Sequence, residues 1–204
     1  MNSTSQASLN YNPFSSTALT GVVGALYEPL FYMNNLKDDP TKLEPLMGKS
    51  YTISDDAKTI DVTIRDGEKW SDGEPYTTED VAYTFNLLNS NKALNTSGFA
   101  GSAKVLSDTE VRITLDKPES VNALSYLSGT LIVPKHVWEK IDDPVTYTNK
   151  DAVGSGPFTV KGGNFSPTAY TFKKNPYYWD EGKPEIDGVR YVPVSYTHLT
   201  LPTT

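Results

Sequence analysis

Apolar and polar residues alternate in two short stretches of the chain. Residues 60–65 read Ile-Asp-Val-Thr-Ile-Arg, and residues 111–115 place an apolar side chain at every second position. A period of two is typical of a strand that buries one face and exposes the other. The turn-forming run Ser107 to Glu110 precedes the second stretch, and Pro118 follows it. We therefore expect antiparallel strands in this part of the chain.

Helical spacing replaces this alternation between the two stretches. Val81, Phe85 and Leu88 lie four and three residues apart, which places them on one face of a helix. Thr77 stands just before them, and Asp80 follows it at the spacing of a capping box. The pattern predicts an amphipathic helix that begins just after Thr77.

Shorter patterns predict the remaining elements. We expect a strand followed by a proline turn over residues 9–16, and a buried helix over residues 20–30, which are small and apolar. Two further short helices are expected at residues 121–127 and 135–141, and a proline starts the second of them. Together these elements indicate a mixed α+β fold.

Composition excludes several kinds of chemistry. The 204 residues include no cysteine and only two histidines, His136 and His198, which excludes thiol catalysis, disulfides and the common zinc sites. The net charge of −7 argues against a nucleic-acid partner, because phosphate binding needs a basic surface. No apolar run approaches the ~20 residues that span a bilayer, and no signal segment is visible in this chain. We expect no metal, no cofactor and no catalytic residue.

Residues 65–81, here named the signature stretch, combine two turns with the start of the predicted helix. Asp-Gly occurs twice, at residues 66–67 and 72–73, and each pair favours a turn. Trp70 lies between the turns and is the expected apolar anchor. Taken one by one, these residues describe a structural turn without chemistry.

Three motifs follow later in the chain. They are Gly-Ser-Gly-Pro-Phe at residues 154–158, Asn-Pro-Tyr-Tyr-Trp at 175–179 and Lys-Pro-Glu-Ile-Asp-Gly at 183–188. The glycine pair could suggest a phosphate-binding loop, but the Lys-Ser/Thr and the helix of a P-loop do not follow it. In this order, the signature stretch and the three motifs resemble the family 5 solute-binding proteins of ABC importers. That family comprises extracytoplasmic receptors for oligopeptides, dipeptides, nickel complexes and some oligosaccharides.

The resemblance covers residues 9–193 and implies an α/β (mixed α+β) fold of the periplasmic-binding-protein type II kind. A small antiparallel α+β lobe is inserted in a main lobe, and the second main lobe is missing, so the chain is expected to be an N-terminal fragment. The implied division is a disordered leader at 1–8, main lobe I at 9–43, the inserted lobe at 44–150, the return to main lobe I at 151–193 and a non-native tail at 194–204.

The resemblance also implies where a ligand binds. The loop at residues 12–19 corresponds to the family's ligand-facing loop, and an aromatic residue behind it is a further candidate for contact. The expected ligand-binding residues are Asn12, Phe14, Ser15, Ser16, Thr17, Leu19 and Tyr27. The alternative is a plain connection in which Thr17 or Thr20 caps a helix. The loop contains serines and no acid, which leaves neutral ligands open.

The implied function is that of the substrate-binding component of an ABC importer, which captures oligopeptides and delivers them to the membrane permease. A cello-oligosaccharide or other oligosaccharide is the alternative ligand. The protein is expected to be a monomer, extracytoplasmic, in the periplasm or lipid-anchored at the cell surface, and not an enzyme. A hydrolase with paired carboxylates is the rival from another class, and its candidate acids are the aspartate pairs at residues 38–39, 55–56 and 142–143.

Overall fold

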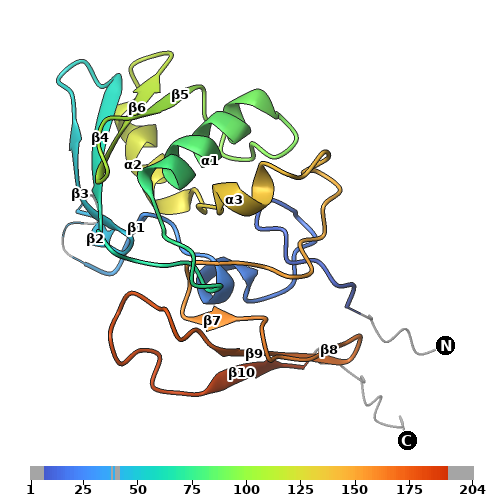
Figure 1. Ribbon diagram of the computed structural model, residues 1–204. Coiled ribbons are helices and arrows are strands. Elements are labelled where there is room, and N and C mark those ends of the chain that lie inside the picture. Colours follow the sequence, from blue (N-terminus) through green and yellow to red (C-terminus); the bar gives the residue numbers. More distant parts are fainter. Residues whose placement is uncertain (1–6, 38, 40–41, 193–204) are drawn as a thin grey trace, which may run out of the picture.

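Two antiparallel sheets, with short helices between and beside them, form the computed structural model of the chain (Figure 1). The structure describes residues 7–37, 39 and 42–192. Residues 1–6 of the expected leader and the whole of the expected tail lie outside this part. In the view of Figure 1 the first sheet lies at the top and the second at the bottom.

The first sheet contains four strands in the order β3-β4-β6-β5. Their bounds are Gly48–Ile53 for β3, Thr59–Ile64 for β4, Gly101–Val105 for β5 and Glu110–Leu115 for β6. The two strands predicted from the alternation are confirmed as β4 and β6. They pair directly, with Ile60 opposite Ile113 and Val62 opposite Val111. This register gathers the apolar side chains of both strands on one face, as the period of two requires.

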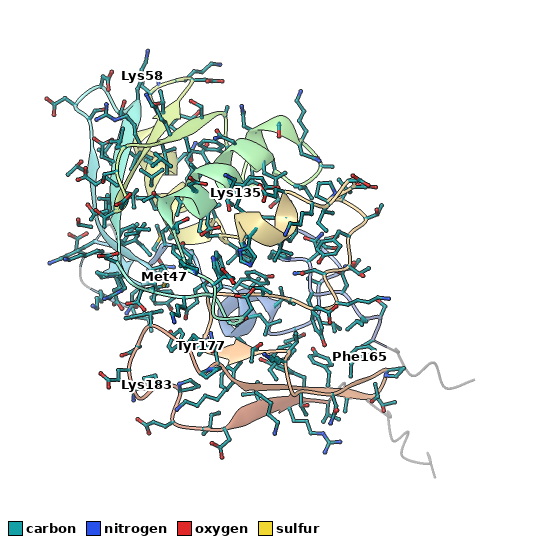
Figure 2. The ribbon with its side chains drawn as sticks, in the orientation of Figure 1. Met47, Lys58, Lys135, Phe165, Tyr177 and Lys183 are labelled. Atoms are coloured by element: carbon teal, nitrogen blue, oxygen red, sulfur yellow. The ribbon has the colours of Figure 1, made fainter. Side chains whose placement is uncertain are left out.

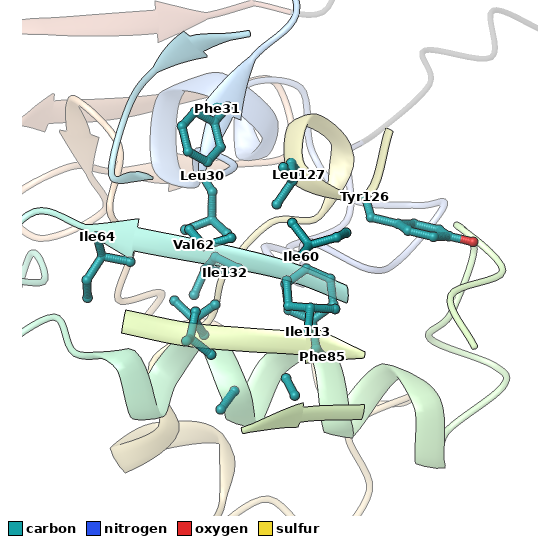
Figure 3. Packing of buried hydrophobic residues seen from close by; sticks show 14 of the residues in the cluster. Leu30, Phe31, Ile60, Val62, Ile64, Phe85, Ile113, Tyr126, Leu127 and Ile132 are labelled. Atoms are coloured by element: carbon teal, nitrogen blue, oxygen red, sulfur yellow. The ribbon is translucent and has the colours of Figure 1, made fainter. Parts of the chain in front are cut away.

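Helices cover the buried face of this sheet. Helix α1 spans Thr78–Ser90 and contacts β5 and β6, and α2 spans Ser120–Gly129. Both confirm predicted helices. Figure 3 shows the resulting core, in which Phe85 of α1 and Leu127 of α2 pack with Leu30, Ile60 and Ile113. All five are 0% exposed, so this core excludes water.

The second sheet contains β7 (Phe158–Thr159), β8 (Phe165–Ser166), β9 (Ala169–Lys174) and β10 (Gly188–Tyr191). Strand β9 is central and pairs with the other three. A second core forms on this sheet from residues near both ends of the described chain, among them Tyr11, Leu26 and Phe172, together with Trp138 from its middle. The first and last segments are therefore held together by apolar burial. A two-stranded ribbon of β1 (Phe31–Tyr32) and β2 (Glu44–Pro45) completes the strands of the described residues.

Three predictions for the local structure are wrong. In place of a helix over residues 20–30 there is one π-helical turn, η1, at Val22–Leu26, in which Val23 and Gly24 are not helical. Gly21 and Gly24 have φ of 89° and 85°, a left-handed backbone that breaks a helix. Residues 9–12 form no strand, although the turn after them is present. Helix α3 spans only Lys135–Trp138 and does not reach residue 141.

The signature stretch contains the predicted apolar anchor and helix start, and it contacts several elements. Trp70 is 0% exposed, and its indole N–H donates to the Asp80 carboxylate at 3.2 Å. The same carboxylate accepts the Thr77 backbone N–H at 2.8 Å, which confirms the predicted pairing at the start of α1. Tyr177, labelled in Figure 2, lies on the loop between β9 and β10, and its ring centroid is 5.6 Å from the Lys69 ammonium. The stretch therefore also contacts the second sheet's loop.

The Gly-Ser-Gly motif packs against the backbone of the first segment. A Cβ on Gly154 would overlap the carbonyl oxygen of Leu26, so a residue with a side chain does not fit there. The Gly156 N–H donates to that same carbonyl at 2.9 Å, and the Glu28 N–H donates to the Ser155 hydroxyl at 3.3 Å. Close packing between two segments explains the glycines without a phosphate.

Candidate ligand-binding loop

Asn10 determines the shape of the loop at residues 10–19. Its side-chain amide donates to the hydroxyls of Ser15 at 2.9 Å and Thr17 at 3.0 Å, and its Oδ1 accepts the Asn12 N–H at 3.0 Å. Its backbone carbonyl accepts the Leu19 N–H at 2.9 Å and so closes the loop. Asn10 was not among the residues expected to form the site. The only signal was the preference of asparagine for local hydrogen bonds in turns.

Asn12 attaches this loop to residues 144–147, which precede the second sheet in the chain. Its side-chain amide donates to the carbonyls of Pro144 at 2.9 Å and Tyr147 at 2.8 Å, while its Oδ1 accepts the Phe14 N–H at 3.0 Å. The residue is 1% exposed. All of these interactions lie within the chain, so Asn12 positions the loop from beneath.

Tyr27 lies behind the loop and is 0% exposed. Its hydroxyl accepts the side-chain amide of Asn149 at 2.8 Å, and the same amide donates to the Tyr11 carbonyl at 3.0 Å. Burial raises the pKa of Tyr27 above its ordinary value, so the phenol stays neutral. Asn149, a left-handed residue with φ of 51°, is a second positioning residue that was not expected from the sequence.

The remaining predicted residues lie nearer to solvent. Ser16 and Thr17 are exposed and Ser15 is half-buried, so hydroxyl groups dominate the outer face of the loop. Leu19 packs against the second core. Phe14 is half-buried and meets Trp138 edge to face, with ring centroids 5.4 Å apart. The structure thus brings the seven predicted residues into one region but gives them different environments.

A small pocket adjoins the loop on one side. Its volume is about 50 Å³, and Phe14 lines it together with residues from the end of α1 and from the end of α2. A larger pocket of about 470 Å³ lies between residues 150–153 and the second sheet, where Tyr11 lines it beside Lys150 and Lys161. Of the seven predicted residues, Phe14 alone lines either pocket.

Glu28 is a buried acid close to the loop in sequence, and its partners lie in the Asn-Pro-Tyr-Tyr-Trp motif. Its carboxylate accepts the Tyr178 hydroxyl at 2.9 Å and the Trp179 indole N–H at 3.2 Å. Burial raises the pKa of Glu28, and the two donors only partly oppose this effect. The acid therefore joins segments 150 residues apart.

The aspartate pairs of the rival hydrolase serve turns where the structure describes them. Asp56 accepts the Ser54 hydroxyl at 2.6 Å, and Asp143 accepts the Thr146 hydroxyl at 2.7 Å. These bonds lower the pKa of both carboxyls. Residue 38, of the pair at residues 38–39, lies outside the described residues. Within the described part of the chain, no three His, Cys, Asp or Glu side chains are grouped so as to hold a metal.

The family model for bacterial extracellular solute-binding proteins, family 5, matches residues 42–200. The chain belongs to this family. The match includes the signature stretch and the three later motifs, and it extends into the residues expected to form a tail. The mixed α/β fold and the resemblance inferred from the sequence are thereby confirmed. Across the residues that the structure describes, no helix is long and apolar enough to cross a membrane.

Two curated relatives show the range of ligands in the family. The chain is 30% identical to the peptidoglycan-binding protein YepA of Agrobacterium fabrum over 91% of its length, and 27% identical to the dipeptide-binding protein DppE of Bacillus subtilis over 90%. It spans 32% and 38% of these relatives, about a third of their length. Both relatives are described as binding proteins.

A solved structure shares the fold. It is an oligopeptide-binding protein of an ABC transporter from Thermotoga maritima, with mannohexaose bound, which superposes with a TM-score of 0.82 at 26% identity. The alignment covers 93% of this chain and 36% of that one. The structure of AppA from Bacillus subtilis in complex with a nonapeptide also shares the fold, with a TM-score of 0.77 at 23% identity.

Proposed function

We propose that the chain is part of the substrate-binding component of an ABC importer, which captures oligopeptides and delivers them to the membrane permease. The observation that carries the proposal is the loop at residues 10–19, which Asn10 and Asn12 fix from within the fold while Ser16 and Thr17 stay exposed. A loop that is already ordered binds a ligand with little further loss of conformational entropy. Membership of family 5 supports the same function.

An oligosaccharide is the second candidate ligand. No acidic side chain lies in the loop to meet the amino terminus of a peptide, whereas its hydroxyls suit a neutral sugar. The relative from Thermotoga maritima with bound mannohexaose supports this alternative. Either ligand would be selected without covalent chemistry, and the protein would not act as an enzyme.

We further propose the architecture implied by the resemblance. Residues 9–43 and 151–193 would form main lobe I, residues 44–150 the inserted lobe, and a second main lobe would face the loop in the complete protein. All four strands of the first sheet lie between residues 48 and 115, which supports an inserted lobe. The complete protein would be an extracytoplasmic monomer that closes on its ligand by a hinge motion.

Calorimetric titration of the full-length gene product with penta-alanine and with cellopentaose tests the proposal. We expect binding of one of the two probes. Replacing Ser16 with Ala should weaken that binding about threefold to tenfold, because one lost hydrogen bond contributes about 0.5–1.5 kcal/mol. Thr17 is left unchanged, because its hydroxyl accepts the Asn10 amide that shapes the loop. The matched control is Thr168→Val, an exposed threonine in the turn between β8 and β9, which should leave affinity unchanged.

The outcomes separate the ligand classes. Heat with penta-alanine alone supports the oligopeptide, and heat with cellopentaose alone supports the oligosaccharide. Cleavage of cellopentaose during the titration would contradict a receptor and favour the hydrolase. If a probe binds and Ser16→Ala binds it as well as the unchanged protein does, the exposed face of the loop is not the ligand wall.

A further inference from the structure

The hydroxyls of Ser15 and Thr17 belong to one hydrogen-bond network, and Asn10 sets its direction. The Oδ1 of Asn10 accepts the backbone N–H of Asn12 at 3.0 Å, and a backbone N–H can only donate. This bond identifies the side-chain oxygen of Asn10, so its amide nitrogen is the atom that faces the two hydroxyls. Both hydroxyl oxygens accept from this amide, Ser15 Oγ at 2.9 Å and Thr17 Oγ1 at 3.0 Å.

The lone pairs of the two oxygens assign the remaining protons. Ser15 Oγ also accepts the Thr17 backbone N–H at 3.2 Å, so both of its lone pairs are used. Its own proton therefore lies in the 3.0 Å contact between Ser15 Oγ and Thr17 Oγ1. Thr17 Oγ1 then accepts twice, from Asn10 and from Ser15. Its own O–H is left without an acceptor among the described residues.

This unused O–H lies on the outer face of the loop. Thr17 is exposed, whereas Ser15 is half-buried. The side-chain hydrogen bonds run from Asn10 through Ser15 to Thr17, and hydrogen bonds in such a chain polarise one another. An isolated threonine hydroxyl can donate or accept, but the hydroxyl of Thr17 is preset to donate.

We propose that Asn10 presets the Thr17 hydroxyl as a hydrogen-bond donor, and that this donor binds a backbone carbonyl oxygen of the captured oligopeptide. A carbonyl only accepts, so it matches the preset hydroxyl, whereas a peptide N–H would meet an oxygen without a free lone pair. Thr17 is then a specificity-determining contact, and Asn10 is a positioning residue that acts through it. The inference rests on the proposed function, because it assigns the polarity of the same loop.

The absence of an acid from the loop fits this assignment. Residues 10–19 include no Asp or Glu, so the loop offers no negative charge to the amino terminus of a peptide. Every residue of a peptide carries a carbonyl, and that group is uncharged. The loop would therefore bind an extended peptide at an internal position of its backbone, whatever its side chains.

Asn10→Asp reverses the network without changing its shape. Aspartate still accepts the Asn12 N–H but has no amide to donate, so Thr17 gives its proton to the new carboxylate and presents lone pairs instead. In the full-length gene product we expect about tenfold weaker binding of penta-alanine, measured by calorimetry. Thr17→Val lacks the donor and should weaken binding about threefold to tenfold, whereas Thr17→Ser keeps the donor and should change it less than about twofold.

The double variant separates the reversed polarity from the added negative charge. If Asn10 acts through Thr17, Asn10→Asp should weaken binding less than about twofold further in the Thr17→Val background. An equal loss in both backgrounds would mean that the charge itself acts on the ligand, which would overturn the proposal. Unchanged binding by Asn10→Asp, in a protein with an unchanged denaturant midpoint, would overturn it as well.

Modified peptides provide a readout that does not depend on any variant of Asn10. One carbonyl of penta-alanine at a time is replaced by a thiocarbonyl, whose sulfur is a weaker acceptor. The unchanged protein should prefer penta-alanine about threefold or more over the thioamide at one position, and Thr17→Val should lose this preference. A merely distorted loop would weaken both peptides alike and leave the preference unchanged, and that result would contradict the assigned contact.

The proposed function and this inference fail in different ways. If neither penta-alanine nor cellopentaose binds to the unchanged protein, the proposed function fails. Heat with cellopentaose alone would leave a receptor but would overturn the carbonyl as the bound group. If penta-alanine binds and no thioamide position depends on Thr17, the inference alone fails.

Discussion

At the scale of single residues, burial determines what a polar side chain does. Glu28 is 9% exposed, and its carboxylate is held by Tyr178 and Trp179. Burial raises the pKa of the Glu28 carboxyl. Between the ordinary and the raised pKa, the folded chain therefore keeps a proton that the unfolded chain has already released. Its contribution to stability is present below that range and is lost as the pH rises through it.

The variant Glu28→Gln tests this sign. Gln does not titrate. The free energy of unfolding of Glu28→Gln minus that of the unchanged chain should therefore increase as the pH rises above the ordinary pKa of a glutamate. Urea unfolding across a pH series measures the difference. Glu185→Gln is the control of opposite sign, because the Lys183 ammonium lowers the pKa of Glu185. A difference for Glu28→Gln that is flat or falls with pH would contradict the raised pKa.

At the scale of elements, one carboxylate joins two helices and a turn. Asp80, 3% exposed, accepts the Trp70 indole N–H and the backbone N–H of Thr77 in the signature stretch. It also accepts the backbone N–H of Lys135 at the start of α3, at 2.8 Å. Asp80 therefore joins the start of α3 to the start of α1 through a buried side chain.

We expect Asp80→Ala to lower the free energy of unfolding by about 3–5 kcal/mol, because four buried or half-buried donors, among them the Thr77 hydroxyl at 3.1 Å, lose their acceptor. Glu79→Ala is the matched control one residue away. Glu79 is exposed and pairs with the Lys135 ammonium at 2.7 Å, an interaction worth about 0–1 kcal/mol in solvent. Guanidinium unfolding measures both variants. Equal losses would show that charge at the start of α1, and not the buried acceptor, stabilises the helix.

At the scale of the whole molecule, the two cores adjoin, and backbone contacts are among those that join them. Leu131 packs in the core of the second sheet, and the next residue, Ile132, packs in the core of the first. Gly154 lies at the same junction: its carbonyl accepts the Ser71 N–H at 3.0 Å, and it packs against Leu26. Closely packed backbone therefore contributes to the coupling of the two sheets.

Gly154→Ala should destabilise both sheets together. The added methyl group overlaps a backbone oxygen, so we expect a loss of about 3 kcal/mol, the upper end of the range for overpacking. Hydrogen exchange should show reduced protection in β4 and in β9. Gly129→Ala, whose methyl group meets open space, is the control. Loss of protection in β9 alone would show that the two cores unfold independently.

Several features were predictable from the sequence because their causes are local. The alternation at residues 60–65 and 111–115 predicted β4 and β6, and the spacing of Val81, Phe85 and Leu88 together with Thr77 predicted α1. These patterns depend on residues a few positions apart. The family, too, was recognisable from short motifs in a constant order.

Only the tertiary structure determined which polar groups are available to a ligand. Asn12 and Tyr27 have the residue types of a binding site, yet their partners Pro144 and Asn149 lie more than 120 residues away and bury both of them. Thr130 is buried and its hydroxyl has no hydrogen-bond partner among the described residues. No pattern in the sequence indicates this, because a missing partner is a property of the packed neighbourhood. Secondary structure follows from local spacing, whereas the satisfaction of a buried polar group follows from contacts between distant segments.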